Sequence, residues 1–356
     1  MSDKRLVKLN WFHDDGFRVF AWIIFWIASI FFMLESAVYK NLIWSFPSLE
    51  NYMMIRNNDD WVHNAFTIQK IKRLAKENSN AKILVYLGGS SSLESISTDE
   101  NMELKLKNKT GKNISFFSIT SSYMTYAEAT MILSELGPIN ATYLISIAPN
   151  YLSKPTWAQI LHDERTYLRY FYLPVPSRVR EILAKYGLDL GLFYTFRTFR
   201  STYALAHQFK HKISSKIFHT EYDRHAAPEK LAHENNNNLT SRWSALVKLH
   251  GNMNIQLLKL VIDTAQTSKN PMILIRMPNA PPLKDSTRVF EETLDKYLLP
   301  ILKKEDVEYL DLREKAQWEV NDFRDTVHLI SSGRKKFEDT LSSELKRYFD
   351  YSGENK

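Results

Sequence analysis

The stretch Ile83-Leu-Val-Tyr-Leu-Gly-Gly-Ser-Ser-Ser92 runs from an unbroken apolar segment directly into two glycines and three serines. An uninterrupted apolar run of this length is typical of a strand buried on both faces of a parallel sheet. Glycine is scarce, with 10 among 356 residues, so two side by side before Ser90 indicate a tight turn at the end of that strand. Such a turn can hold a hydroxyl and its own backbone N–H toward an incoming acyl group.

Other glycine-containing motifs do not fit this turn. No Gly-Lys-Ser/Thr follows, as a phosphate-binding loop would require, and the dinucleotide pattern Gly-x-Gly-x-x-Gly is not met. The α/β-hydrolase elbow Gly-x-Ser-x-Gly also fails, because Ser92 stands where its last glycine should be. A serine-rich turn without chemistry is the plain alternative.

Four further short apolar runs follow the first, and helix-length segments separate them. This alternation predicts an α/β domain in which helices cover both faces of a five-stranded parallel sheet. In a doubly wound sheet of order 2-1-3-4-5, strands 1 and 3 flank the switch point at which ligands bind. A connector over residues 40–80 is expected to end in an amphipathic helix before the first strand. The five predicted strands are Ile83–Leu87, Ile114–Ile119, Tyr143–Ile147, Met272–Met277 and Val307–Leu312.

The composition excludes several classes of protein. The hydrophobic content of 44% is sufficient for a packed core, and 356 residues allow two modest domains or one large one. The chain has no Cys, which excludes disulfide frameworks, Cys-zinc sites and thiol nucleophiles. Neither His-Glu-x-x-His nor an acidic calcium-loop spacing occurs, so no metal and no cofactor are expected.

The segment Val19–Leu34 contains no charged residue and is rich in Phe, Ile and Trp. Extended to Tyr39 it reaches the roughly 20 residues that a helix needs to cross a bilayer. A buried core helix and a cleaved signal peptide are the alternatives. The positive-inside rule predicts a cytoplasmic tail over 1–18, a single-pass anchor over 19–39 in the inner (cytoplasmic) membrane, and everything after it in the periplasm or at the cell surface. The cations before the segment are Lys4, Arg5, Lys8 and Arg18, and only Lys40 follows closely.

An insertion at about 151–250 separates the third and fourth strands and carries the positive charge of the chain. It contains 15 Lys and Arg against 8 Asp and Glu, an excess equal to the formal net charge of +7 for the whole sequence. Ordinary solvated helix faces explain such a pattern, and so does a basic cap that binds anionic headgroups or an anionic glycan. Nucleic acid is not an expected partner. The asparagine run at 235–238 is expected to be a surface loop.

A serine hydroxyl is a weak nucleophile at neutral pH, so a catalytic Ser90 needs a general base and the base needs an orienting partner. Asp325-Thr-Val-His328 supplies a pair whose spacing lets the carboxylate accept a hydrogen bond from the ring. This pair precedes a predicted amphipathic helix over Gly333–Phe349. At the end of the third strand, Asn150 can direct its amide at a developing oxyanion beside the Ser90 backbone N–H, although asparagine after proline is also a common turn residue.

In order and spacing, these blocks resemble the SGNH (GDSL-like) hydrolase superfamily. The matching features are the strand followed by Gly-Gly-Ser-Ser, the Ala-Pro-Asn segment, and Asp-x-x-His-Leu with a glycine five residues after the histidine. The resemblance covers 81–349, interrupted by the insertion, and implies a flavodoxin-like three-layer domain. It implies Ser90 as nucleophile with Ser91 as an alternative, His328 as general base and then acid, Asp325 as its orienting residue, and Asn150, Ser90 and Ser122 as oxyanion donors.

The sequence departs from the family pattern around the oxyanion donors. Gly89 replaces the common Asp before the serine, and Ala148 replaces the usual Gly of the Asn block. The glycine of the second block is missing, and Ser121 or Ser122 occupies that region. A weakened oxyanion hole, or one that uses a serine N–H or hydroxyl, is therefore expected.

An N-terminal anchor joined to an extracytoplasmic domain of this kind resembles bacterial proteins that act beside membrane-bound O-acyltransferases. These include the D-alanyl-lipoteichoic acid transfer protein and the alginate or peptidoglycan O-acetylation proteins. The resemblance implies serine-dependent O-acyl transfer to an envelope polysaccharide or other polymer, with the membrane and a membrane-bound O-acyltransferase as partners. An esterase or deacylase of an envelope glycan or lipid, and a non-catalytic polymer-binding scaffold, remain alternatives.

Overall fold

The structure is a computed structural model that describes residues 15–39, 60–121, 124–148, 151–152, 173, 175–187, 236–281, 288–305 and 307–354. It contains one five-stranded, all-parallel sheet of order β2-β1-β3-β4-β5. The predicted α/β class, the five-stranded parallel sheet and the strand order 2-1-3-4-5 are therefore confirmed. The strands are β1 (Lys82–Gly88), β2 (Ile114–Thr120), β3 (Ala141–Ile147), β4 (Met272–Arg276) and β5 (Glu308–Asp311).

The central strands are buried on both faces, as their continuous apolar runs predict. In β4 every residue is buried, and in β1 only Lys82 is exposed. The edge strand β5 is shorter than its predicted run and only partly buried. Because parallel strands bury both faces under helices, burial of this kind requires two helical layers.

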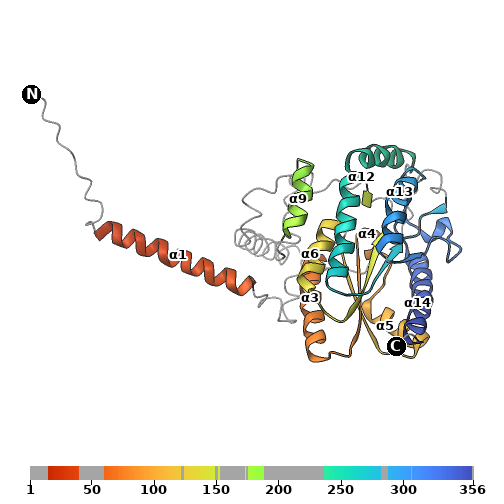
Figure 1. Cartoon of the computed structure of the whole chain (residues 1–356), viewed down its shortest axis with the longest axis horizontal. Helices are drawn as coiled ribbons and strands as arrows, with labels where there is room; N and C mark the ends of the chain where they lie inside the picture. Colours follow the sequence, from red (N-terminus) through yellow and green to blue (C-terminus); the bar gives the residue numbers. More distant parts are fainter. Residues whose placement is uncertain are drawn as a thin grey trace, which may run out of the picture.

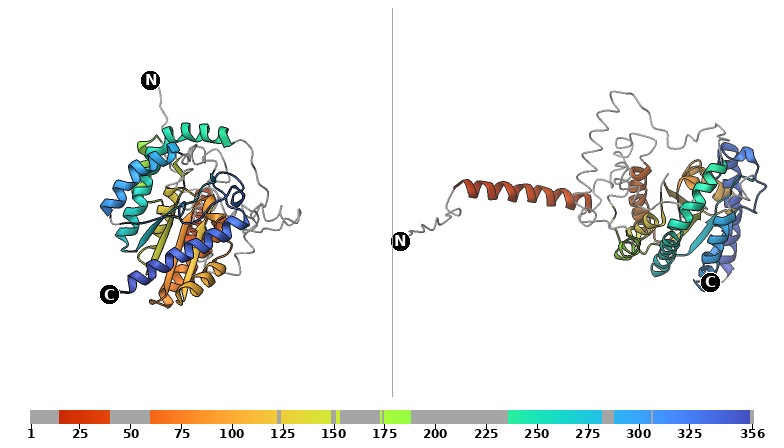
Figure 2. Two further views of the ribbon diagram at one scale, coloured as in Figure 1. Left: turned by 90° about the vertical axis from the view of Figure 1, so that its right-hand side faces the viewer. Right: turned by 90° about the horizontal axis from the view of Figure 1, so that it is seen from above.

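Helices lie on both sides of the sheet (Figures 1 and 2). On one side α5 (Asp99–Thr110) packs against α14 (Ser331–Glu354). On the other side α12 (Asn236–Thr267) packs between α6 (Tyr126–Leu136) and α13 (Arg288–Glu305). This arrangement is consistent with a three-layer fold and places the carboxyl ends of all five strands at one edge of the sheet.

A helix is present in the second half of the expected connector. Helix α3 (Asp60–Glu77) packs on β2 and α6, with Ile68 and Ile71 fully buried. Residues 40–59 of the expected connector lie outside the described residues.

The uncharged N-terminal segment forms helix α1 (Asp15–Tyr39), which extends away from the layered domain (Figures 1 and 2). The large apolar side chains that the structure describes on α1 are exposed, including Trp22 at 60% and Phe32 at 66%. Across the residues that the structure describes, no helix meets the combined length and apolarity of a membrane span.

Most of the basic insertion lies outside the described residues, so the predicted basic cap does too. The described parts are α9 (Ser177–Lys185), whose Arg178 pairs with Asp263 at 2.8 Å, and the start of α12. The expected loop over the asparagine run is wrong, because α12 begins at Asn236. Asparagine is a favoured residue at helix starts, where its side chain can accept from free backbone N–H groups.

Helix α5 begins with a partly buried carboxylate that contacts β2. Asp99 Oδ1 accepts hydrogen bonds from the hydroxyl of Ser118 at 2.6 Å and from its backbone N–H at 3.1 Å. Burial raises the pKa of Asp99 to about 7, although both hydrogen bonds from Ser118 act in the opposite direction. The folded protein therefore keeps this proton up to about pH 7, whereas an unfolded chain releases it near pH 4.

Asp99→Asn is expected to remove a pH-dependent loss of stability. Between about pH 4 and pH 7 the folded state binds more protons than the unfolded state, so wild-type stability falls as pH rises and then levels off. The stability of Asp99→Asn relative to wild type should rise by about 2–3 kcal/mol between pH 4.5 and pH 8. Urea unfolding at both pH values measures this difference. Glu100→Gln, at the exposed neighbouring position, should show no such change, and equal behaviour of the two variants would contradict the assignment.

Candidate active site

The turn after β1 depends on a glycine for close packing. A Cβ atom at Gly88 would lie 2.0 Å from Ser92 Oγ and 2.1 Å from Ser146 Oγ, so no side chain fits. Gly89 then leads directly into the short helix α4 (Ser90–Leu93). The structure therefore contains the predicted strand-to-helix turn, and Gly88 lets that helix fold back onto the strand end.

The three serines of the turn have different environments. Ser91 and Ser92 are buried, at 0% and 1% exposure, whereas Ser90 is partly exposed. Ser92 Oγ donates to Ser146 Oγ at 2.6 Å, and Ser91 Oγ has no hydrogen-bond partner. Since a nucleophile must contact its substrate, the exposure favours Ser90 over the alternative Ser91.

A buried tyrosine accepts a hydrogen bond from the backbone N–H of Gly89, the residue before Ser90. The N–H of Gly89 donates to Tyr151 Oη at 2.5 Å, and this oxygen lies 3.3 Å from both Ser92 Oγ and Ser146 Oγ. Burial raises the pKa of Tyr151, so its phenol stays neutral and can accept this hydrogen bond. The Gly89 N–H is therefore engaged in the fold. No described residue accepts a hydrogen bond from the backbone N–H of Ser90.

The segment before α14 forms a small hairpin at the carboxyl edge of the sheet. Phe323 and Leu329 form an antiparallel bridge, and the N–H of Arg324 donates to the carbonyl of His328 at 2.8 Å. A Cβ atom at Gly333 would lie 2.2 Å from the carbonyl oxygen of Asp322. The glycine that follows the histidine by five residues therefore lets α14 begin directly against the base of this hairpin.

Gly333→Ala is expected to destabilise the protein by about 1–3 kcal/mol, because the added methyl group collides with backbone that cannot move freely. Gly251→Ala is the matched control. Gly251 is also buried in a helix, but its added Cβ would meet only Val247 Cγ1, at 3.4 Å, so this change should be neutral or stabilise by up to about 1 kcal/mol. Urea unfolding of the full chain compares the variants. Equal stabilities would show that the hairpin tolerates a side chain at Gly333.

The hairpin brings Asp325 and His328 into contact. Asp325 Oδ2 lies 2.6 Å from His328 Nδ1, and Asp325 Oδ1 accepts from the backbone N–H groups of Val327 and His328, both at 3.0 Å. Burial acts to raise the pKa of Asp325, but His328 and the two N–H groups outweigh it and the pKa is lowered. The ionised carboxylate therefore holds the proton of His328 on Nδ1, which leaves Nε2 as an acceptor.

Two contacts attach this hairpin to the serine turn. Arg324 Nη2 lies 2.7 Å from Glu94 Oε1, and Arg334 Nε donates to the carbonyl of Glu94 at 3.1 Å. Glu94 closes α4, since its own N–H donates to the carbonyl of Ser90 at 3.0 Å. Burial raises the pKa of Glu94, and the nearby His328 and Arg324 act to lower it. The Ser90 turn and the Asp325–His328 pair therefore lie beside one another.

No hydrogen bond joins the hydroxyl of Ser90 to the ring of His328 among the described residues. His328 Nε2 is buried and has no partner. In enzymes without bound substrate such a contact is often long and tightens when the complex forms.

The other predicted oxyanion donors are not placed. Asn150 and Ser122 lie outside the described residues. Their neighbours are described: Ala148 is fully buried after β3, and the N–H of Ser121 donates to the carbonyl of Gly88 at 3.1 Å. The backbone of Ser121 is therefore used to join β2 to the end of β1.

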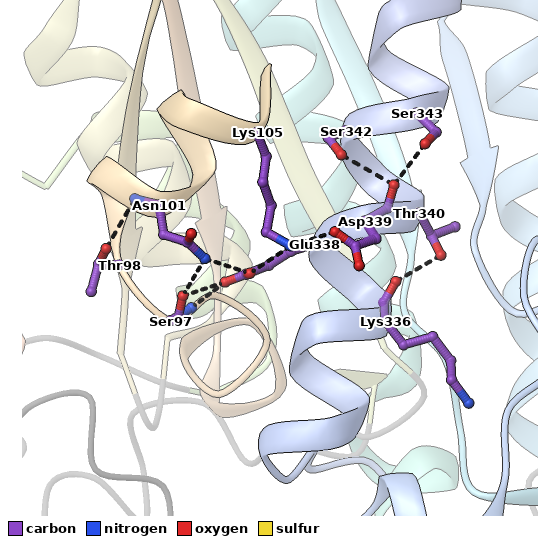
Figure 3. A network of polar contacts seen from close by, with 10 residues as sticks. All are labelled: Ser97, Thr98, Asn101, Lys105, Lys336, Glu338, Asp339, Thr340, Ser342 and Ser343. Atoms are coloured by element: carbon purple, nitrogen blue, oxygen red, sulfur yellow. Dashed lines mark hydrogen bonds and ion pairs between the residues drawn. The ribbon is translucent and has the colours of Figure 1, made fainter. Parts of the chain in front are cut away.

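A buried carboxylate on α14 fixes the loop after α4, as Figure 3 shows. Glu338 Oε1, on α14, accepts from both the N–H and the hydroxyl of Ser97 at 2.6 Å, and Oε2 accepts from Asn101 Nδ2 at 2.8 Å. Lys105 pairs with the adjacent Asp339. Because α14 directly follows the hairpin, these contacts help to fix the position of the hairpin relative to the serine turn. No short sequence motif predicts these contacts.

The residues that the structure describes include no group of three or more His, Asp or Glu side chains arranged to hold a metal ion. No protein-family model and no curated protein matches the chain.

Proposed function

We propose that this chain is a serine-dependent O-acyltransferase in which Ser90, His328 and Asp325 act together. The observation that carries the proposal is the 2.6 Å contact between His328 Nδ1 and Asp325 Oδ2, in a hairpin attached to the turn that begins at Ser90. A hydrogen-bonded acid–imidazole pair beside a partly exposed serine is what nucleophilic catalysis by a hydroxyl requires.

In the proposed reaction the hydroxyl proton of Ser90 passes to His328 Nε2 while Oγ attacks the carbonyl carbon of an acyl donor. The tetrahedral oxyanion is stabilised by backbone N–H groups, of which that of Ser90 is one. The imidazolium, balanced by Asp325, then protonates the leaving oxygen, and an acyl-serine ester forms. In the second step an acceptor hydroxyl gives its proton to His328 while its oxygen attacks the ester carbonyl. The bond between the acyl carbon and Ser90 Oγ then breaks, His328 returns the proton to Ser90 Oγ, and the acceptor leaves with the acyl group.

Membership of the SGNH-like group is part of this proposal. The sheet order, the glycine turn before Ser90 and the glycine at 333 support it. Asn150 and Ser122 are proposed as further oxyanion donors. The N–H of Gly89 already donates to Tyr151 and is not available to the oxyanion. We therefore expect fewer oxyanion donors here than in an enzyme whose turn leaves this N–H free.

We propose that the acceptor is an envelope polysaccharide or other polymer, and that α1 anchors the chain in the inner membrane beside a membrane-bound O-acyltransferase. The uncharged run Val19–Leu34, the exposed apolar side chains of α1 and the preceding cations support this placement. Accessibility of a cysteine introduced near the C-terminus to an impermeant thiol reagent in intact cells tests it, because the natural chain has no Cys. Labelling only after lysis would contradict an extracytoplasmic domain.

Water as acceptor turns the same site into an esterase, and the two activities differ only in how the second step is completed. Mass spectrometry of surface polymers from cells with and without the gene separates them. Loss of polymer acylation without the gene supports transfer, and a gain supports removal. If acylation depends on the gene but is retained with Ser90→Ala, the chain acts as a scaffold instead.

A further inference from the structure

The largest fully buried side chain of the described residues is an arginine at the end of β4. Arg276 is 0% exposed, and its Nε, Nη1 and Nη2 atoms are all buried without a hydrogen-bond partner. The strand ends at this residue, so Arg276 lies at the carboxyl edge of the sheet, where ligands bind in folds of this type.

An isolated buried guanidinium is strongly unfavourable. It carries five N–H donors, and each donor that loses water without gaining an acceptor costs free energy. Arginine also stays protonated in proteins, so it cannot avoid this cost by becoming neutral. A fold that places this residue in its interior is therefore expected to pair it with an anion.

The nearest acid on the neighbouring strand does not fill this role. The sheet register places Arg276 beside Asp311 of β5. The Asp311 carboxylate is held by Arg313, with Nη2 at 2.6 Å and Nε at 2.9 Å from its oxygens. The charge of Arg276 does act to lower the pKa of Asp311, yet no hydrogen bond joins the two side chains.

A second buried donor without an acceptor lies near this guanidinium. Tyr126 begins α6 and is 3% exposed, and its Oη is buried with no hydrogen-bond partner. Burial raises the pKa of Tyr126, and the charge of Arg276 is close enough to oppose that rise. The Tyr126 ring also packs edge-on against Tyr151, at 5.9 Å between centroids, and Tyr151 binds the N–H of Gly89. Tyr126 is therefore connected to the serine turn through the ring of Tyr151.

We propose that Arg276 and Tyr126 form an internal binding site for an oxyanion, either a free carboxylate or phosphate ion or the carboxylate of a sugar acid. The planar guanidinium matches two oxygens of such a group, and the phenol O–H can donate to one of them. The site does not depend on the acyl-transfer reaction, so it stands or fails separately from the proposed function.

Anion-dependent thermal stability of the full chain in non-ionic detergent tests the site. The buffer is Tris chloride, which contains no oxyanion, and the probes are inorganic phosphate, acetate and glucuronate, each compared with added chloride of equal ionic strength. A saturable rise in Tm is expected, roughly 5 °C at a hundredfold excess over Kd. A rise with phosphate or acetate indicates a free ion, and a rise with glucuronate alone indicates a sugar acid.

Arg276→Met removes the charge while nearly keeping the volume. It is expected to fold without added anion, because the substitution removes the desolvation cost of an unpaired buried charge. It should lose the anion-dependent rise. Tyr126→Phe keeps the ring contact and should weaken the apparent affinity about tenfold, the loss of one hydrogen bond to a charged group. Arg178→Met, on the exposed surface of α9, should respond as wild type does.

Two results would overturn the site. One is the absence of a saturable rise in Tm with all three anions in the wild-type chain. The other is an equal rise in wild type and Arg276→Met, which would place the anion elsewhere. Should Arg276→Met not fold, an unchanged response of Tyr126→Phe would also count against the site.

Discussion

Ser90→Ala is expected to reduce acyl-ester turnover by on the order of 10³-fold or more, with the fold retained. The side chain is partly exposed and makes no hydrogen bond with any described residue, so its removal costs little stability. Release of nitrophenol from a nitrophenyl acetate ester by the full chain in detergent measures the effect. Without this hydroxyl no acyl-enzyme forms, and only binding and oxyanion stabilisation remain.

Ser91→Ala is the matched control, one residue along the same turn. Its hydroxyl is buried without a partner, so replacement by Ala should leave activity within about twofold and stability unchanged or slightly higher. Loss of turnover in Ser91→Ala but not in Ser90→Ala would move the nucleophile to Ser91. Loss in neither variant would remove the serine mechanism.

Asp325→Asn is expected to lower turnover by about 10²–10⁴-fold. The carboxylate accepts from His328 Nδ1, whereas an amide NH₂ at the same place would donate to it. The ring would then carry its proton on Nε2 and could not accept the proton of Ser90. Turnover against pH should show a loss at every pH, since the tautomer and not only the charge is changed.

Asp339→Asn serves as the control for removal of a carboxylate. Asp339 is exposed on α14 and pairs with Lys105, so the change should leave turnover near that of wild type. Equal activity of Asp325→Asn and wild type would show that the pair is a structural contact only.

The fold could be predicted from the sequence because its signals are local. The apolar runs of β1 and β3 are continuous and bounded by turn residues, so the strands could be placed along the chain, with ends shifted by one or two residues. The order of the strands in the sheet came from the doubly wound fold class that their alternation with helices indicated. The Asp325–His328 hydrogen bond was predictable for the same reason, since three residues separate the partners.

The supports of the site could not be predicted, because their partners are far apart in the chain. Arg324 and Glu94 are separated by 230 residues, and Tyr151 and Gly89 by 62. The sequence indicated that the glycine pair forms a tight turn before Ser90, but not what each glycine does there. In the structure Gly88 allows close packing of α4 on the strand end, and the N–H of Gly89 donates to Tyr151. Nor does a single Arg at the end of an apolar strand indicate that its side chain is buried.

Covalent labelling with a fluorophosphonate, followed by peptide mass spectrometry, tests the central claim most directly, because the reagent reacts with serines activated by a neighbouring base. The account predicts one adduct per chain, on Ser90, that is lost in His328→Ala while the variant remains folded. An adduct on another residue, or labelling of Ser90 that is unchanged by His328→Ala, would contradict it.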